Sequence, residues 1–269
     1  MGIQALYTAA SGMQALDFKL NVVANNLANV ETPGFKRSRV NFEDVFYQTI
    51  EEPGKRTPLD FPKPVGKQVG LGVQVSGTQL IFQQGSFDVT NQPLDLSIHG
   101  EGFFQVTTIV DGQERIAYTR AGNFSRNANG DVTLLNSVGS RLEPTINIPQ
   151  DAVEIVIGTQ GLVQVRSQGS SQFNDVGQIQ LARFINAPGL KQLGKNLYLD
   201  TEASGPPILG NPTQDGLGEI QQGQLELSNV DPVRELVELI RTQRGFELNS
   251  QSIQSSDQLL QAIVNLRRF

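Results

Sequence analysis

Few residues in this chain have the chemistry of a catalytic or metal-binding site. His99 is the only histidine and the chain has no cysteine, so thiolate nucleophiles and cysteine-based zinc sites are excluded. His99 ends a strand-like pattern and precedes Gly100, which favours a structural turn residue over a Ser-His-Asp triad, and no G-x-S-x-G motif is present. Asn127, Asn129 and Asp131 weakly resemble a calcium loop, but the misplaced glycine favours a hairpin turn.

Phosphate-binding and acid–base chemistry have as little support. The glycine pairs at 70–72 and 100–102 lack the third glycine and the following helix of a dinucleotide site. Some of the 27 acidic residues must lie close together in any fold, so a glycosidase pair stays open without being favoured. Lys36, Arg37 and Arg39 form a basic cluster, which is either a solvated turn or an ion-pairing contact. We predict that the chain is not an enzyme and has no catalytic, cofactor-binding or metal-binding residues.

Composition and the N-terminal segment limit which partners the chain can bind and how it can be exported. The formal net charge of -6 argues against nucleic-acid binding, which needs a basic face, and no motif predicts a small-molecule substrate. The first cationic residue is Lys19, and polar residues interrupt the apolar ones before it, unlike a secretory signal. We expect a chain that is cytoplasmic or exported without a cleaved signal peptide.

The first thirty residues predict an amphipathic helix. Their apolar residues alternate spacings of three and four, the heptad pattern of a helix that packs along a partner helix. Pro33 and Gly34 predict its end. The apolar seam consists of Leu6, Ala9, Met13, Leu16, Leu20, Val23, Leu27 and Val30.

The C-terminal segment predicts a longer helix whose seam contains more polar residues. Asp231 can cap its start, and Pro232 suits the first helical position. An apolar residue recurs every seven positions, and the companion positions that we assign, Gln243, Ser250 and Asp257, are polar. The repeat consists of Leu239, Phe246, Ile253 and Leu260.

The middle of the chain, from Val69 to Leu225, predicts short antiparallel strands. Apolar and polar residues alternate there with period two, Asp111-Gly112 and Asn129-Gly130 are hairpin-turn dipeptides, and no long amphipathic pattern interrupts them. The segment from Glu51 to Lys67 is rich in proline, which favours an extended backbone. That segment is either a flexible linker or an ordered arm that contacts a neighbouring subunit.

Helical ends around a β body suggest a mechanism of assembly. A single apolar seam facing water does not offset the conformational entropy lost when such a helix orders. The first helix therefore needs the C-terminal helix and then neighbouring copies, and we predict that both ends order on assembly. We assign self-assembly to Leu6, Met13, Leu16, Leu20, Val23, Leu27, Leu239, Phe246, Ile253 and Leu260.

Four segments resemble signatures of a known family. The run ANNLANVETPGFKR (residues 24–37) and the run SNVDPVRELVELIRTQRGFELNSQSIQSSDQLLQ (residues 228–261) are similar to the terminal signatures of flagellar rod and hook proteins. The runs QGSFDVTNQPLDLSIHGEGFFQV (residues 84–106) and YTRAGNFSRNANGDV (residues 118–132) resemble the core of the same proteins. Over essentially its whole length, the chain resembles the flagellar basal-body rod protein family. The motif residues are Asn25, Asn26, Leu27, Asn29, Thr32, Gly34, Phe35 and Lys36.

The resemblance implies a structural role. The run VGLGV (residues 69–73) and the proline-containing insertion before it look most like the distal rod member of the family. That member implies a helical homopolymer, a straight tube that transmits motor torque to the hook and forms part of the export channel. Gly245 departs from the family, which usually has alanine there, and glycine inside a helix costs ~1 kcal/mol.

The implied partners are other copies of the chain, the proximal rod proteins, the hook protein, the surrounding periplasmic and outer-membrane rings, and the flagellar export apparatus. The implied location is the periplasm-spanning rod of the basal body. A proximal rod or hook-type axial subunit of the same family is the main alternative. A periplasmic glycan-active or glycan-binding protein is a further one.

The predicted fold class is mixed α and β, with N- and C-terminal helices paired as a coiled coil, a mainly antiparallel β central domain and an extended linker arm. The predicted helical assembly domain covers residues 1–35 plus 228–269. The extended linker region covers 36–75 plus 215–227, and the β-rich outer domain covers 76–214.

Overall fold

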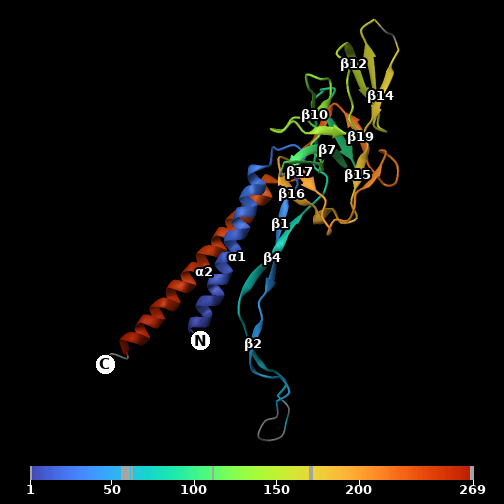
Figure 1. The fold of residues 1–269 in the computed structure, drawn as a ribbon. Helices are drawn as coiled ribbons and strands as arrows, with labels where there is room; N and C mark the ends of the chain where they lie inside the picture. Colours follow the sequence, from blue (N-terminus) through green and yellow to red (C-terminus); the bar gives the residue numbers. More distant parts are fainter. Residues whose placement is uncertain (1, 56–60, 62, 111, 170–171, 267–269) are drawn as a thin grey trace. The chain divides into compact units, whose positions relative to one another are not determined.

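The computed structural model describes residues 2–55, 61, 63–110, 112–169 and 172–266 (Figure 1). The chain forms two compact units. Unit 1 contains Met1–Leu27, Ser38–Gln79 and Pro232–Phe269, and unit 2 contains Ala28–Arg37 and Leu80–Asp231. The chain therefore passes between the units four times, and each unit combines segments that are far apart in the sequence.

Two long helices dominate unit 1. Helix α1 spans Gly2–Ala28, helix α2 spans Pro232–Leu266, and they run side by side in opposite directions (Figure 1). Helix α2 begins where the sequence predicts, because the fixed φ of Pro232 suits the first turn. Helix α1 ends at Ala28, a few residues before the turn that contains Pro33 and Gly34. No helix in the described part of the chain has both the length and the apolar character needed to span a bilayer.

One prediction about the buried face of α2 was wrong. The apolar residues of its seven-residue repeat are partly buried, but the companion positions lie three residues further on and not four. Thr242 is buried and Asn249 and Ser256 are partly buried, whereas Gln243 and Asp257 are exposed. Of the three predicted companion positions, Ser250 alone is partly buried. In a seven-residue repeat, the residues three and four positions after each apolar residue flank the apolar stripe on opposite sides. The position of the partner helix decides which of the two is buried.

A long two-stranded ribbon completes unit 1. Strand β1 pairs with β4, and β2 pairs with β3 in antiparallel register. Beyond β2, the N–H of Gly54 donates to the carbonyl oxygen of Lys63 at 2.9 Å, and the N–H of Lys63 donates to that of Lys55 at 3.1 Å. The proline-rich segment is thus the tip of the ribbon, although residues 56–60 and 62 lie outside the described residues. The strands are β1 (Ser38–Asp44), β2 (Tyr47–Glu51), β3 (Lys67–Gly70) and β4 (Val73–Leu80).

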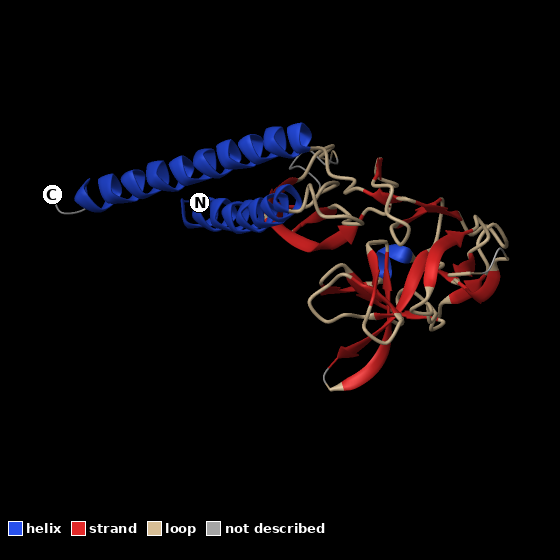
Figure 2. Cartoon of the chain, turned by 90° about the horizontal axis from the view of Figure 1, so that it is seen from above, coloured by secondary structure: helices blue, strands red, loops and turns tan. Residues whose placement is uncertain are grey.

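Unit 2 is built from strands, apart from the short 3-10 helix η1 (Ala187–Gly189) (Figure 2). Its largest sheet has nine strands: β16-β17-β8-β7-β11-β10-β9 in order, with β15 also paired to β7, and β18 to β15. Smaller sheets are β12-β13-β14, β19-β6 and β20-β5. The strands are β5 (Phe87–Val89), β6 (Leu96–His99), β7 (Phe103–Val110), β8 (Gln113–Thr119), β9 (Phe124–Arg126), β10 (Val132–Leu134), β11 (Arg141–Glu143), β12 (Ala152–Ile157), β13 (Leu162–Ser167), β14 (Asn174–Gln178), β15 (Leu181–Arg183), β16 (Lys191–Gly194), β17 (Leu197–Leu199), β18 (Ile208–Gly210), β19 (Glu219–Gln222) and β20 (Gln224–Glu226).

Both hydrophobic cores of the described chain lie in unit 2. The larger core is mainly aliphatic and joins the nine-stranded sheet to the β12-β13-β14 and β19-β6 sheets. The second core is aromatic, and its rings meet edge to face with centroids 4.8 to 6.1 Å apart, a favourable geometry for aromatic pairs. Neither core contains a described residue of unit 1. The rings are those of Phe82, Phe103, Tyr118, Phe184 and Tyr198.

The architecture confirms the mixed fold class, with a helix near each end and a mainly antiparallel β body. Between Val69 and Leu225, the described residues contain no α-helix. The dipeptide Asn129-Gly130 turns the hairpin of β9 and β10, as predicted. Asp111 of the second predicted turn lies outside the described residues, and the strands on either side of it pair.

Candidate functional site

The two helices approach each other closely at two glycines. A Cβ atom on Gly245 of α2 would stand 3.2 Å from Cδ1 of Leu16 on α1. A Cβ atom on Gly12 of α1 would stand 3.2 Å from Nδ2 of Asn249 on α2. Each glycine therefore makes room for a side chain of the other helix, which gives Gly245 a packing reason to be there despite its cost to helix stability.

Polar contacts continue the same register along the helices. Lys19 of α1 forms an ion pair with Glu238 of α2. Further along α1, Nδ2 of Asn26 donates to Oε2 of Glu235 at 3.2 Å. As the residue numbers rise along α1, those of the contacting residues in α2 fall, so the helices pack antiparallel.

A buried amide joins three segments of unit 1. Asn26 is 1% exposed, its Nδ2 donates to the carbonyl oxygen of Ser38 at 2.9 Å, and its Oδ1 accepts from the N–H of Ser38 at 3.0 Å. The amide thus pairs with Ser38 as a neighbouring strand would. Glu235, its partner in α2, is also 1% exposed. One side chain therefore ties the end of α1 to the start of β1 and to the first turn of α2.

The ribbon lies directly against α1. Oγ of Ser11 accepts from the N–H of Val73 at 3.3 Å and donates to the carbonyl oxygen of Thr8 at 2.9 Å. Gly72 has φ of +121°, and a Cβ atom there would stand 2.1 Å from Oγ of Ser11. Glycine is required at this position because the ribbon backbone comes too close to the helix for any side chain.

A buried charge cluster organises the turn after α1 in unit 2. Nζ of Lys36 lies 2.5 Å from Oε1 of Glu226, and both side chains are 0% exposed. Nη1 of Arg120 lies 3.4 Å from Oε2 of the same carboxylate. Lys36 also donates to the carbonyl oxygen of Gln83 at 2.8 Å, and Glu226 accepts from the N–H of Gly85 at 3.0 Å. The solvated-turn interpretation is therefore wrong for Lys36, and the ion-pair interpretation holds within one chain.

Burial controls the electrostatics of this cluster. It lowers the pKa of Lys36, against the opposing attraction of Glu226. It also lowers the pKa of Arg120, again against the attraction of Glu226. Removing one member of such a cluster leaves an uncompensated charge in the interior, so its members are expected to tolerate substitution poorly.

Backbone contacts of the same turn complete the junction. Gly34 has φ of +70° and donates its N–H to the carbonyl oxygen of Glu226 at 2.8 Å. Asn229, which follows β20, accepts from the N–H of Arg37 at 2.8 Å through Oδ1 and donates through Nδ2 to the carbonyl oxygen of Ile81 at 2.7 Å. The turn, the segment that follows β4 and the segment before α2 are thus held together by side chains of the two terminal signatures.

The predicted assembly residues lie along the helix pair. Val23 is buried, and the other nine residues assigned to self-assembly are partly exposed. The structure places Leu16 against Gly245, one position before Phe246. Three of the family-motif residues, Asn26, Gly34 and Lys36, are buried. Asn26 contacts Ser38 and Glu235, while Gly34 and Lys36 contact Glu226. The sequence analysis did not predict the buried contacts of these three residues. The one sequence feature that points to such contacts is the presence of two family signatures, one near each end of the chain.

The residues with possible chemistry have structural roles. His99 ends β6, and its ring stacks on that of Phe87 with centroids 3.8 Å apart. Asn127 accepts the N–H groups of Asn129 and Asp131 at 2.9 Å and so shapes the predicted hairpin. Within the residues that the structure describes, no cluster of three or more histidine, aspartate or glutamate side chains could hold a metal ion.

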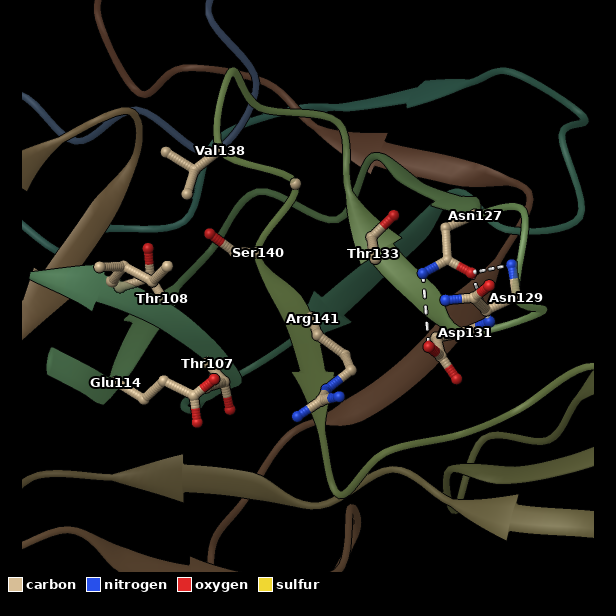
Figure 3. Close-up of a pocket in the computed structure, with 12 residues that line it drawn as sticks. Thr107, Thr108, Glu114, Asn127, Asn129, Asp131, Thr133, Val138, Ser140 and Arg141 are labelled. Atoms are coloured by element: carbon tan, nitrogen blue, oxygen red, sulfur yellow. Dashed lines mark hydrogen bonds between the residues drawn. The ribbon is translucent and has the colours of Figure 1, made fainter. Parts of the chain in front are cut away.

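An open pocket of about 290 Å³ adjoins this hairpin (Figure 3). The side chains of Glu114, Asp131 and Arg141 are among its lining. Hydrogen bonds from Asn147 and Asn127 hold the pKa of Asp131 below its usual value, so this carboxylate is an ionised acceptor that serves the turn.

Comparison with known proteins gives matches across both units. The model of the flagellar hook protein FlgE/F/G D1 domain matches residues 97–165. The model of the flagellar basal body rod FlgEFG protein C-terminal region matches residues 221–266, and that of the flagella basal body rod protein matches residues 6–36. The three matched regions thus fall on the β unit and on the two helical ends.

Full-length relatives decide the family. The chain is 46% identical over 266 residues to the flagellar basal-body rod protein FlgG of Caulobacter vibrioides, covering 98% of this chain and 100% of the relative. It is 44% identical over 264 residues to the protein of that name from Buchnera aphidicola subsp. Schizaphis graminum, with coverage of 98% and 100%. The chain belongs to the flagellar basal-body rod protein family. It is therefore a structural protein of the flagellar basal body and not an enzyme.

A more distant relative belongs to another part of the same organelle. The chain is 24% identical over 448 residues to the flagellar hook protein FlgE of Borreliella burgdorferi, covering 98% of this chain and 100% of that protein. The alignment is much longer than the 269 residues of this chain, so the hook protein contains long segments with no counterpart here.

Proposed function

We propose that the chain is a subunit of the distal part of the flagellar rod, which polymerises into a straight helical tube. The observation that carries this proposal is the location of the two hydrophobic cores. Both lie in unit 2, and the described part of unit 1 contributes to neither. Two helices and a ribbon without a core of their own gain too little from packing to be stable alone in water, and neighbouring copies can supply the missing contacts.

The surface of unit 1 supports the same proposal. Phe46 is 87% exposed and Val65 is 76% exposed, although both are large and apolar. Apolar side chains gathered on one part of a protein mark a surface that associates. The exposed large apolar residues of unit 1 are Tyr7, Phe18, Phe42, Phe46, Tyr47, Ile50, Phe61, Val65, Val69, Leu71, Val233, Leu236, Val237, Ile240, Leu248 and Leu259.

The helix pair is proposed to form a coiled coil that lines the tube. Its support is the heptad spacing of both seams and the antiparallel register between Gly12 and Asn249, Leu16 and Gly245, and Lys19 and Glu238. In this proposal, residues 1–35 plus 228–269 form the assembly domain and residues 76–214 form the outer wall. Residues 36–75 plus 215–227 form the extended linker region.

The ribbon is proposed to be the arm that braces neighbouring subunits. Its strands carry exposed aromatic and aliphatic side chains, and a two-stranded ribbon with such a surface needs a partner. Glu51 and Lys63 form an ion pair at 2.9 Å near its tip, which favours an ordered arm over a flexible linker. Contacts of this kind between copies would keep the tube straight.

The position within the flagellum rests on the relatives. The full-length relatives with identities of 44% and 46% are named as rod proteins, while the hook protein is 24% identical and longer. These identities favour a rod subunit over a hook subunit. In this role the chain would contact proximal rod proteins, the hook and the surrounding rings. It would reach them through the flagellar export apparatus.

A single substitution in the seam tests the proposal. Leu20 is partly buried on α1, while its neighbour Asn21 is exposed. We expect the unmodified chain and the control Asn21→Asp to form tubes visible by electron microscopy, and Leu20→Asp to form none. The near-ultraviolet circular dichroism of the aromatic core should stay the same in all three, because that core belongs to unit 2. Normal tubes from Leu20→Asp would refute the proposed mechanism of assembly.

A further inference from the structure

The ribbon of unit 1 carries an exposed pocket at the bend between β1 and β2. The N–H of Val45 donates to the carbonyl oxygen of Gly72 at 2.9 Å, so the other side of the ribbon holds the backbone of the bend in place. The pocket has a volume of about 410 Å³, and acidic and aromatic side chains dominate its lining. We call it the ribbon pocket, and its lining consists of Glu43, Asp44, Val45, Phe46, Tyr47 and Gln74.

Two carboxylates give the ribbon pocket a negative charge. Glu43 and Asp44 are the only charged residues within the ranges 40–50 and 68–80. Nε2 of Gln74 donates to Oε1 of Glu43, and the side chain of Tyr47 forms a hydrogen bond with that of Asp44, so both partners are neutral. Neither carboxylate forms an ion pair with another described residue. The negative charge of the pocket is therefore available to a cation from outside the chain.

Exposed aromatic rings lie beside these carboxylates. Phe46 is 87% exposed and Tyr47 is 56% exposed. A guanidinium group forms ion pairs with carboxylates and also stacks on aromatic faces, while an ammonium group is a strongly hydrated point charge. Carboxylates next to exposed rings therefore fit an arginine side chain of a partner.

Helix α2 presents an exposed arginine between apolar side chains. We call this surface the α2 arginine face, and its residues are spaced four, three and four positions apart: Val237, Arg241, Arg244 and Leu248. Val237 and Leu248 are 44% and 66% exposed, so α1 leaves this face uncovered. Arg241 is exposed and has no ion pair or hydrogen bond with another described residue.

The carboxylates that flank Arg241 along α2 have partners of their own. Glu238 pairs with Lys19 of α1. Glu247 pairs with Arg244 at 3.0 Å. The guanidinium of Arg241 therefore remains available to a carboxylate from another copy.

Arg141 of unit 2 fits the ribbon pocket less well. It also has no ion pair or hydrogen bond with another described residue. However, Glu114 and Asp131 line the same hollow as Arg141 (Figure 3). These two carboxylates would repel a further pair of carboxylates, so charge complementarity favours Arg241.

We propose that the ribbon pocket of one copy receives Arg241 of a second copy, while Phe46 packs on the α2 arginine face beside it. The exposure of Phe46 shows that the two surfaces do not meet within one chain. Because they are different surfaces of the same chain, their contact is head-to-tail and can repeat from copy to copy, as an open polymer requires. The inference rests on the proposed function and names the contact by which the ribbon braces a neighbouring subunit.

Photochemical cross-linking locates the partner of Phe46 directly. Chains with p-benzoylphenylalanine at position 46 are mixed with an excess of ¹⁵N-labelled chains of unchanged sequence, assembled and irradiated. Mass spectrometry of the digested tubes then shows which labelled peptide is captured, and the label proves that it comes from another copy. The control carries the same photoreactive residue at Ile185, which is 82% exposed in unit 2.

We expect labelled peptides from residues 237–248 to be captured several-fold more by position 46 than by position 185, and only after assembly. Tubes in which position 46 captures another segment, or only its own chain, would overturn the pairing and leave the proposed function intact. Failure of the unmodified chain to form tubes would contradict both the pairing and the proposed function.

A charge exchange gives an independent readout. Arg241→Glu places three carboxylates together at the proposed contact, so it should raise the concentration needed for assembly several-fold. Arg115→Glu changes the net charge equally at an exposed site of unit 2 and should not. Adding Asp44→Arg to Arg241→Glu should restore assembly, because the opposite charges then meet with exchanged positions. A double variant that assembles no better than Arg241→Glu alone, or an equal effect of Arg115→Glu, would overturn the pairing.

Discussion

Lys36 and Glu226 form an ion pair at 2.5 Å in which both side chains are completely buried, although 190 positions separate them in the sequence. The pair joins the turn after α1 to the last strand before α2. Because Gly34 donates to the backbone of Glu226 as well, the turn is attached at two points. The turn of the N-terminal signature is therefore attached to the strand just before the C-terminal signature, and Asn229 of that signature accepts from the N–H of Arg37 in the same turn.

The first prediction removes the cation of this pair. Lys36→Met leaves the buried carboxylate of Glu226 with the more distant guanidinium of Arg120, so we expect a loss of roughly 3–5 kcal/mol in the free energy of unfolding of the β unit. Lys36→Met combined with Glu226→Gln should recover part of this loss. The measurement is urea unfolding followed by tyrosine fluorescence, with Lys191→Met at an exposed site as control. A loss below about 0.5 kcal/mol for Lys36→Met would contradict the role of the pair.

The second prediction concerns Gly34. A Cβ atom there would stand 2.4 Å from the backbone N of Ala121, at a φ of +70°. Gly139 has a similar φ of +66°, but a Cβ atom there would meet nothing within 4 Å. Gly139→Ala should therefore cost about 1–2 kcal/mol from backbone strain alone, and Gly34→Ala clearly more, because the clash is added. Thermal unfolding of both variants measures the difference, and equal losses would show that the close approach does not matter.

The third prediction concerns alkaline pH. Burial raises the pKa of Tyr118 to about 12, and burial also raises the pKa of Tyr198. The folded state keeps these protons where the unfolded chain loses them, so their contribution to stability is fully present below pH 10. The contribution of Tyr118 is lost as the pH rises from 10 through 12, and that of Tyr198 is lost at still higher pH. The slope approaches ~1.4 kcal/mol per pH unit for each tyrosine. Unfolding free energies measured across this window should lose the slope in the variant with Tyr118→Phe and Tyr198→Phe, and an unchanged slope would refute the assignment.

The fourth prediction concerns the tip of the ribbon. Glu51 and Lys67 face each other in the ladder of β2 and β3, so residues 52–66 can be replaced by an Asn-Gly turn. We expect normal folding of the subunit but tubes that are curved or more flexible in electron micrographs. A control of the original length, with serine and glycine at 52–66, separates the effect of length from that of sequence. Straight tubes of full strength from the Asn-Gly variant would show that the tip does not brace the assembly.

The sequence predicted the elements better than their contacts. The start of α2 at Pro232, the hairpin at Asn129-Gly130 and the β body follow from local chemistry, namely the fixed φ of proline, the turn preference of Asn-Gly and alternating polarity. The buried side of α2 was misplaced by one residue, since Thr242 and not Gln243 is buried beside the apolar repeat. Local spacing cannot show on which side of a stripe the partner helix lies.

The junctions could not be predicted for a related reason. Lys36 is followed by Arg37 and Arg39, and such a run is usually a solvated turn, so nothing local indicates a fully buried ammonium group. From the sequence, Asn26 and Asn229 resemble ordinary helix-end or loop residues. In the structure, their side-chain amides bond to backbone groups of Ser38 and Arg37, as a neighbouring backbone would. These roles depend on partners that lie far away in the sequence and appear only when the fold brings them together.

The central claim is that the helical ends order through contacts between copies, while the β unit folds alone. Amide hydrogen exchange on the purified chain, before and after tube formation, tests it most directly. The account predicts fast exchange for residues 2–28 and 232–266 in the monomer, strong protection of both in the tube, and protection of the β unit in both states. Terminal helices that are fully protected in a compact monomer that never polymerises would contradict it.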